Sequence, residues 1–371
     1  MLTILNGLAT ALFTYGSHSL AACLVALGVG RLLHRPQDRD IVWKAAIVLP
    51  VLTATWRIAS GTSHLRFDLS ELVRRAGIAQ LPGRQVVIRV LDDNAGHTVF
   101  RQVIDPVATS LSGALAGIAL ACIAVACARL VHRRAALSRA LAGRVPVREL
   151  PGVGAKVSVR LSVAEALPSP VALGRSEICL PSVVVDTFSR EQRDVLVAHE
   201  VAHLERRDPH WFFAVEVVSA LSAFQPLAAV VARAFRQDVE LICDEVAARA
   251  ARERYALIGA LARLASPFDP CSPLLGAATA YDGSSLVERA TRIATAADEH
   301  DGRRSRRHGM VAALLLVAAL GAVPVVTFAP RLDDLTLDPL GAARRAMRAG
   351  RIVTVDSTVT DRHARFEVVI R

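Results

Sequence analysis

Two histidines four residues apart, with a glutamate after the first, are the residues of this sequence best suited to chemistry. They are His199, Glu200 and His203, within the stretch VLVAHEVAHLERRD. On a helix, residues i and i+4 project from one face, so both imidazoles can bind one zinc ion. Glu200 would lie beside that ion, where it can take a proton from a bound water. The pattern predicts a hydrolytic zinc site of the H-E-x-x-H type, with Glu200 as the catalytic base.

A catalytic zinc ion takes three protein ligands and keeps an open position. The stretch QDVELICDEVAA, residues 237–248, offers Glu240 and, one turn later, Asp244. Either carboxylate can bind the ion while the other accepts a His N–H. None of the six cysteines forms a C-x-x-C pair, so we expect small buried hydrophobes and no thiolate ligands.

Both stretches also have an alternative interpretation. The acids could form a solvated helix face, and the histidines could lie hydrogen-bonded on an amphipathic helix near a membrane. The apolar residues around both stretches favour a buried site, because unpaired His and Glu side chains are costly in apolar surroundings.

Several elements must position these side chains. Ser189 with Gln192 three residues later predicts a capping box at the start of the His-bearing helix. KVSVRLSV, residues 156–163, alternates like a strand. SPVALGRSEICLPS, residues 169–182, indicates a second pair of strands punctuated by Gly and Pro.

The stretch WFFAVEVVSALSAFQPLAAVVARAF, residues 211–235, is apolar enough to be considered as a membrane crossing. Polar residues and a proline interrupt it. A full crossing would also put Glu240 on the opposite side of the membrane from His199. We therefore predict a helical hairpin that turns near 224–226, packed on the protein or dipping into the membrane interface.

The composition of the 371-residue chain is that of a membrane protein. Over half of its residues are hydrophobic and they collect in long runs. Trp43 and Trp56 lie near the ends of one run, as expected for anchors at the membrane interface. We predict four transmembrane helices, at about 5–33, 41–59, 107–131 and 309–330.

The basic residues orient these helices. The net charge is +10, and most of the excess lies beside the apolar runs, in 31–44, 129–144 and 303–308. This placement favours membrane topology over binding of nucleic acid, which we do not expect as a partner. With the basic segments in the cytoplasm, residues 132–308 form a cytoplasmic protease domain on a multi-pass protein of the inner membrane. Both termini are then extracytoplasmic, together with the loop 60–106 and the tail 331–371.

With both motifs identified, the chain resembles the membrane-integrated zinc peptidases of the BlaR/MecR antirepressor type. HEVAHLERRD (199–208) has the H-E-x-x-H-x-x-R-x-D layout of that family, and ELICDE (240–245) is similar to its E-x-x-C-D-E element. VALGRSEICLP (171–181) resembles the strand before its protease helix, and LVERATRI (286–293) resembles the segment that leads into its last span. The resemblance covers about residues 1–330.

The resemblance implies a mainly α, polytopic membrane protein with an α+β, gluzincin-like metalloprotease domain between the third and fourth spans. It implies one Zn²⁺ per chain, held by His199, His203 and Glu240. Asp208 and Asp244 are the candidates that orient these ligands. The implied activity is endopeptidase cleavage at the cytoplasmic face, often of a partner transcriptional repressor.

A peptide substrate of such a protease commonly binds as an added strand along a sheet edge. The candidate edge is VALGRSEICL, with Leu173 and Gly174 as substrate-binding residues, and an ordinary structural strand is the alternative. The chain itself is a second candidate substrate. The linker 266–306 is rich in small residues and expected to be mobile, and YDGSSLVERA (281–290) is the candidate cleavage segment.

Two further functions stay open at this point. One is an HtpX-like membrane protease of quality control, and the other is a non-catalytic membrane sensor or scaffold. A large penicillin-binding sensor follows the fourth span in the beta-lactam receptors. Here residues 331–371 follow it and contain no S-x-x-K motif, so we do not expect beta-lactam sensing.

Overall fold

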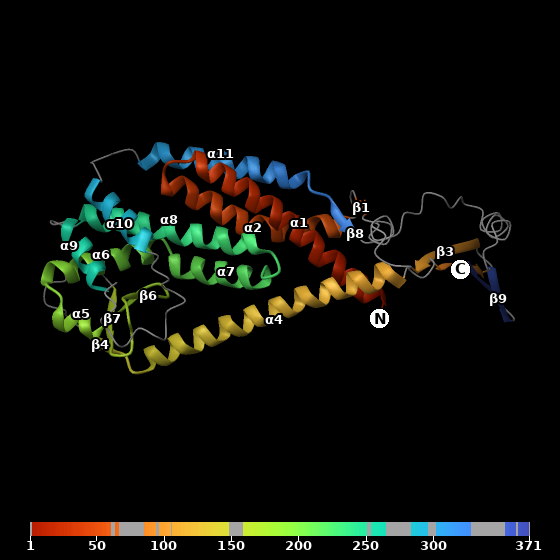
Figure 1. Cartoon of the computed structure of the whole chain (residues 1–371), viewed down its shortest axis with the longest axis horizontal. Coiled ribbons are helices and arrows are strands. Elements are labelled where there is room, and N and C mark those ends of the chain that lie inside the picture. The colour runs from red at the N-terminus through yellow and green to blue at the C-terminus, as the bar shows by residue number, and fades with distance from the viewer. Residues whose placement is uncertain are drawn as a thin grey trace. The chain divides into compact units, whose positions relative to one another are not determined.

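A computed structural model describes most of the chain, and its described residues are mainly helical, as predicted (Figure 1). They are residues 2–60, 64–66, 85–93, 96–104, 106–147, 159–250, 254–264, 283–295, 302–327, 353–360 and 363–370. The chain divides into two compact units. The first comprises Met1–His18, Thr53–Ala121 and Val323–Arg371, and the second comprises Ser19–Leu52 and Cys122–Ala322.

Three helices are long and apolar enough to cross a membrane within the described part of the chain. They are α1 (Leu2–Leu32), α2 (Pro36–Ser60) and α4 (Pro106–Ala142). They coincide with the first three predicted spans, although α4 continues well past residue 131. These helices mark the chain as a membrane protein.

The fourth predicted span is shorter as a helix than expected. Helix α11 (Gly302–Gly321) ends nine residues before position 330, where the predicted span ends, and β8 (Val325–Thr327) then pairs in parallel with β1 (His64–Arg66). Pro324 lies between them, and proline disfavours helical backbone at the residue before it. The apolar part of α11 that the structure describes, His308–Gly321, falls below the ~20 residues of a full crossing. The fourth crossing therefore stays a prediction.

The first unit contains an antiparallel sheet built from two distant segments. Its strand order is β3-β2-β10-β9. Strands β2 (Gln85–Asp93) and β3 (Gly96–Ile104) come from the loop 60–106, and β9 (Val353–Thr360) and β10 (His363–Ile370) come from the tail. Such pairing requires the loop and the tail to lie on one side of a membrane, which agrees with the topology predicted from the charges.

The second unit contains a sheet beside the His-bearing helix. The strand order is β4-β5-β7-β6, with β5 parallel to β7 and the other pairs antiparallel. Along β7, Ile178 and Leu180 pack on α6, whereas Cys179 packs toward Leu141 of α4, as the alternation of side chains in a strand requires. The strands are β4 (Val145–Val147), β5 (Arg160–Ala164), β6 (Val171–Leu173) and β7 (Glu177–Pro181). The first half of the strand predicted at 156–163 lies outside the described residues.

Helices α5 (Ser182–Thr187) and α6 (Arg190–Glu205) follow the sheet. The predicted capping box at the start of α6 is confirmed. Ser189 Oγ accepts a hydrogen bond from Gln192 N at 3.2 Å, and Ser189 N donates to Gln192 Oε1 at 3.1 Å. The helix start is therefore fixed by two local bonds before any tertiary contact forms.

The predicted hairpin is also confirmed. Helices α7 (Asp208–Leu221) and α8 (Pro226–Ala250) run antiparallel around a turn at 222–225 (Figure 1). Since α8 does not cross away from α6, Glu240 stays beside the histidines.

The linker 266–306 was predicted to be mobile, and this is wrong for its middle. Residues 283–295 form helix α10, which packs against α8 and α9 (Arg254–Leu264). Ile293 of α10 is 1% exposed within a core that includes Val195 and Leu257. Burial of one face of α10 stabilises this helix. The small residues of the linker did not indicate such burial. The parts of the linker at 266–282 and 296–301 lie outside the described residues.

The role predicted for Trp43 is wrong. Its side chain is buried and donates a hydrogen bond from Nε1 to Asp238 Oδ2 at 2.7 Å. Arg39 binds the same carboxylate with two nitrogens. Gly30 of α1 makes room for the ring, since a Cβ there would lie 2.5 Å from Trp43. The Trp43 side chain is thus packed into the protein and does not face lipid.

The contact between α11 and α2 gives the first prediction. A Cβ on Gly309 would lie 2.7 Å from the backbone oxygen of Asp38, whose side chain accepts a hydrogen bond from Gly309 N. We expect Gly309→Ala to lower the free energy of unfolding by about 1–3 kcal/mol, because a helix backbone must shift to admit the methyl group.

Gly28→Ala in α1 is the matched control, because a Cβ there would meet nothing within 4 Å. It should be neutral or slightly stabilising. Thermal unfolding of the purified chain in detergent measures both variants. Equal melting temperatures would contradict the close approach of the two helices.

Candidate metal centre

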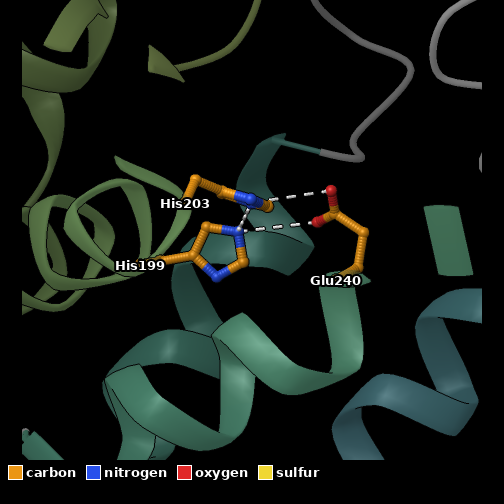
Figure 2. Close-up of side chains that lie close together, drawn as sticks. All are labelled: His199, His203 and Glu240. Atoms are coloured by element: carbon orange, nitrogen blue, oxygen red, sulfur yellow. Dashed lines mark hydrogen bonds and ion pairs between the residues drawn. The ribbon is translucent and has the colours of Figure 1, made fainter. Parts of the chain in front are cut away.

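Three side chains predicted as metal ligands converge in the second unit (Figure 2). His199 and His203 extend from α6, and their Nε2 atoms lie 3.1 Å apart. Glu240 of α8 faces both, with Oε2 at 3.5 Å from His199 Nε2 and Oε1 at 3.7 Å from His203 Nε2. Both histidines are buried, while the side chain of Glu240 is about one third exposed. The site is therefore enclosed on the helix side and open beside Glu240.

These separations fit a zinc ion. With bonds of about 2.0–2.1 Å, two ligand atoms of a tetrahedral zinc site lie about 3.4 Å apart. The three separations of 3.1, 3.5 and 3.7 Å bracket this value. Two imidazole nitrogens that face each other so closely also need a proton or a cation between them. The donor set of two nitrogens and one carboxylate would leave a fourth position for water or substrate.

Two buried carboxylates hold the opposite ring nitrogens. Asp208 Oδ2 lies 2.9 Å from His203 Nδ1, and Asp244 Oδ1 lies 3.1 Å from His199 Nδ1. A carboxylate beside each Nδ1 favours the imidazole form that carries its proton there, which leaves the Nε2 lone pairs for a metal. The sequence left open which acid of the ELICDE stretch faces the metal position. In the structure Glu240 does so, and Asp244 lies behind His199.

Asp208 reaches His203 because the chain turns sharply between α6 and α7. Arg207 has φ 59°, in the left-handed region, and Asp208 is the first residue of α7. A residue other than glycine in this region costs about 1–2 kcal/mol. The surrounding contacts of Asp208 have to offset this strain.

The electrostatics of the site favour a bound cation. Burial alone would lower the pKa of His199, but the carboxylates of Asp244 and Glu240 outweigh it and raise this pKa to about 10. Desolvation would raise the pKa of Glu240, yet Arg289 and the two imidazoles hold it well below its ordinary value. Burial raises the pKa of Glu200, which the histidines oppose only in part.

Arg289 was missed from the sequence. This α10 residue is 3% exposed and binds Asp244 through Nε at 2.6 Å and through a terminal nitrogen at 2.7 Å. The same nitrogen lies 3.3 Å from Glu240 Oε2. Arg289 lies one helical turn before the buried Ile293, and this spacing was the sequence signal that could have placed Arg289 on the buried face of the helix. The acidic partners lie more than 40 residues earlier, so the sequence could not identify them.

A second network connects the site to the start of α2. Asp40 lies 3.3 Å from Arg206, whose Nε lies 3.1 Å from the Asp208 carboxylate that holds His203. Asp238, which lies two residues before Glu240 on α8, binds Arg39 of α2. Both ligand-bearing helices are thus tied to one membrane helix.

Cys243 is buried, as predicted, but it also makes polar contacts. Its Sγ lies 3.4 Å from His203 Nδ1 and 3.6 Å from Asp208 Oδ2. Burial raises the pKa of this thiol, so it stays protonated. These three residues form a second grouping of possible metal ligands among the described residues. Because Arg206 already pairs with Asp208, we interpret the grouping as support for His203.

The candidate substrate strand lies beside the catalytic base. The backbone of Ala172 in β6 lies near the Glu200 carboxylate, and its N–H acts to lower the pKa of that group. Leu173 packs with Cys179 and Leu141 on the opposite face of the sheet. Its side chain therefore points away from Glu200, and a substrate contact at this position would use the backbone. Gly174 follows in a turn with φ 60°.

A comparison with protein families agrees with this geometry. The family model described as the BlaR1 peptidase M56 matches residues 19–293, well over half of the chain, and this range includes every site residue named above. The chain belongs to the BlaR1 peptidase M56 family. As an M56 member with membrane-spanning helices it is a membrane peptidase by family, in agreement with the resemblance seen in the motifs. No curated protein matches the sequence.

The buried position of Arg289 in this M56 peptidase gives the second prediction. Arg289→Ala should lower the free energy of unfolding by about 3–5 kcal/mol, because Asp244 would stay buried without its counter-charge. Arg292→Ala on the same helix should cost less than about 1 kcal/mol, since its ion pair with Glu288 is exposed. Denaturant unfolding in detergent, with a chelator present, compares the two. Losses of equal size would contradict the role of Arg289 as the buried counter-charge.

Proposed function

We propose that the chain is a zinc-dependent endopeptidase that hydrolyses peptide bonds at the cytoplasmic face of the inner membrane. It acts as a signal transducer by cleaving a partner transcriptional repressor. The observation that carries the peptidase proposal is the convergence of two Nε2 atoms and the Glu240 carboxylate, with Glu200 next to the first histidine in the chain.

The residues of the site divide the chemistry among them. A zinc ion would be held by His199, His203 and Glu240, and it would supply a Lewis acid able to lower the pKa of water from about 15.7 to near 7. Glu200 accepts the proton of the attacking water and passes it to the leaving amine. The backbone N–H of Ala172 lies near this carboxylate and favours its charged form.

The substrate is a protein segment in extended form. Strand β6 has β7 on one side and, within the described part of the chain, no strand on the other. An extended peptide can add to this edge through main-chain hydrogen bonds. A purely structural strand is the alternative for β6.

The regulatory part of the proposal rests on the family and on the predicted topology. A cytoplasmic site on a membrane helix bundle is suited to a cytosolic repressor. Self-cleavage within 281–290 would require α10 to unwind, because residues 283–290 are helical and Arg289 is buried. Equal cleavage of unrelated unfolded proteins would favour the HtpX-like alternative, and bound zinc without hydrolysis would favour the non-catalytic sensor.

The third prediction separates metal binding from catalysis. His199→Ala should lose the metal and the activity together. Glu200→Gln should keep about one zinc per chain and lower kcat by about 100- to 10,000-fold, because it removes the base and no ligand.

The measurements are metal content and cleavage of a casein-like substrate or of a candidate repressor. Glu205→Gln, an exposed glutamate on the same helix, is the matched control and should change neither. An active Glu200→Gln enzyme would exclude this mechanism.

The fourth prediction concerns the sheet edge. Gly174 has a positive φ, which valine adopts only with strain and asparagine adopts readily. Gly174→Val should displace the end of β6 and raise KM, with the metal retained. Gly174→Asn should behave like the native chain. A KM unaffected by valine would favour the purely structural strand.

A further inference from the structure

The part of the α7–α8 hairpin around its turn carries no charge. The sixteen residues VVSALSAFQPLAAVVA, 217–232, lie between Glu216 and Arg233. Leu221 and Val230 are each 47% exposed on this segment. These two large apolar side chains are thus exposed on adjacent helix segments that carry no charge.

Charged side chains from several helices meet where this uncharged segment begins. Arg134 of α4 binds Glu216 of α7, which also pairs with Arg236 of α8 at 3.2 Å. Lys44 of α2 lies 5.0 Å from the ring centre of Trp211. We call Lys44, Arg134, Glu216 and Arg236 the charged collar. It lies where the apolar runs of α2 and α4 give way to basic residues, which is where lipid head groups are expected.

The tip of the hairpin reaches a membrane helix well beyond the collar. The side chain of Gln225 lies close to the thiol of Cys23 of α1. Cys23 precedes Arg31, the first charged residue of that helix, by eight residues, or about 12 Å of helix. Along α8, Pro226 precedes Arg233, the first charged residue of that helix, by seven residues, or about 10 Å. The hydrocarbon core is about 30 Å thick, so one leaflet is about half of that. By both estimates the tip reaches through most of one leaflet.

The turn pairs several of its own backbone groups. Ser222 N donates to Val218 O at 2.9 Å, and Gln225 N donates to Ser222 O at 2.8 Å. The Gln225 side chain accepts from Ala228 N at 2.6 Å, and Pro226 has no N–H to satisfy. A turn in hydrocarbon needs such internal pairing because no water is available there.

We propose that the α7–α8 hairpin is a re-entrant membrane element. Residues 217–232 enter the leaflet next to the metal site, contact its acyl chains and return without crossing the bilayer. Glu240 follows Arg236 by four residues, about 6 Å of helix, so the metal site lies directly at the membrane surface. The proposal rests on the hairpin and the collar, and it holds whether or not the site is a peptidase.

Spin labelling of two valines on α8 tests the depth. Val230 and Val246 are both exposed but lie sixteen residues, about 24 Å, apart, on opposite sides of the collar. Each is changed to cysteine in a full-length, cysteine-free background and labelled with a nitroxide. The protein is placed in vesicles of phosphatidylethanolamine and phosphatidylglycerol.

At Val230 we expect collisions with oxygen to dominate over those with a water-soluble nickel chelate, and at Val246 we expect the reverse. Nickel-accessible labels at both positions would overturn the proposal, since the hairpin would then lie in water. Labels at Val230 shielded from both reagents would overturn it as well, because protein would cover that face.

The native chain provides a second measurement that needs no substitution. A lipid-soluble diazirine, photolysed in the same vesicles, should label the peptide 217–232 at least as strongly as an equal length of α4. It should leave the end of α8 around Val246 unlabelled. A hairpin labelled no more than that end would refute the re-entrant arrangement.

Discussion

Concentrated negative charge within the protein is the constraint on which the rest of this structure depends. Asp208, Asp244 and Glu200 are buried beside two imidazoles, with Glu240 at their open edge. A buried charge without a partner costs several kcal/mol. The fold therefore has to bring positive groups to this place, and each arrives on a different element. Arg206 comes from the turn after α6, Arg289 comes from α10, and a metal cation would complete the set.

This requirement explains why elements far apart in the chain meet here. Helix α10 is short, yet Arg289 attaches it to Asp244 with a bidentate pair of the kind that gives geometric specificity. The start of α2 would be an ordinary helix end at a membrane, but its acidic and basic residues join the same network through Arg206 and Asp238. The position of α2 in the membrane and the orientation of His203 are thus mechanically linked. A displacement of α2 would act on the metal through Asp208.

The sequence predicted those parts of the site that are local or follow a spacing rule. The i, i+4 histidines, the neighbouring base and the Ser189 cap depend only on helix geometry. The hairpin was predicted because the ligands have to share one side of a membrane. Arg289, Trp43 and the strained turn at Arg207 depend on contacts between distant segments, which no local pattern encodes. The helix within the expected linker was missed for the same reason, since its stability comes from packing against α8 and α9.

The dependence of the ligand helices on α2 has a practical consequence for anyone who would express residues 132–308 alone. Such an excised fragment would keep the two histidines, both neighbouring aspartates and Glu240. It would lose Arg39 and Trp43, which satisfy the Asp238 carboxylate, and Asp40, which neutralises Arg206. It would also expose the uncharged tip of the hairpin to water. We therefore expect this fragment to be less stable than a chain that also includes the helices before it.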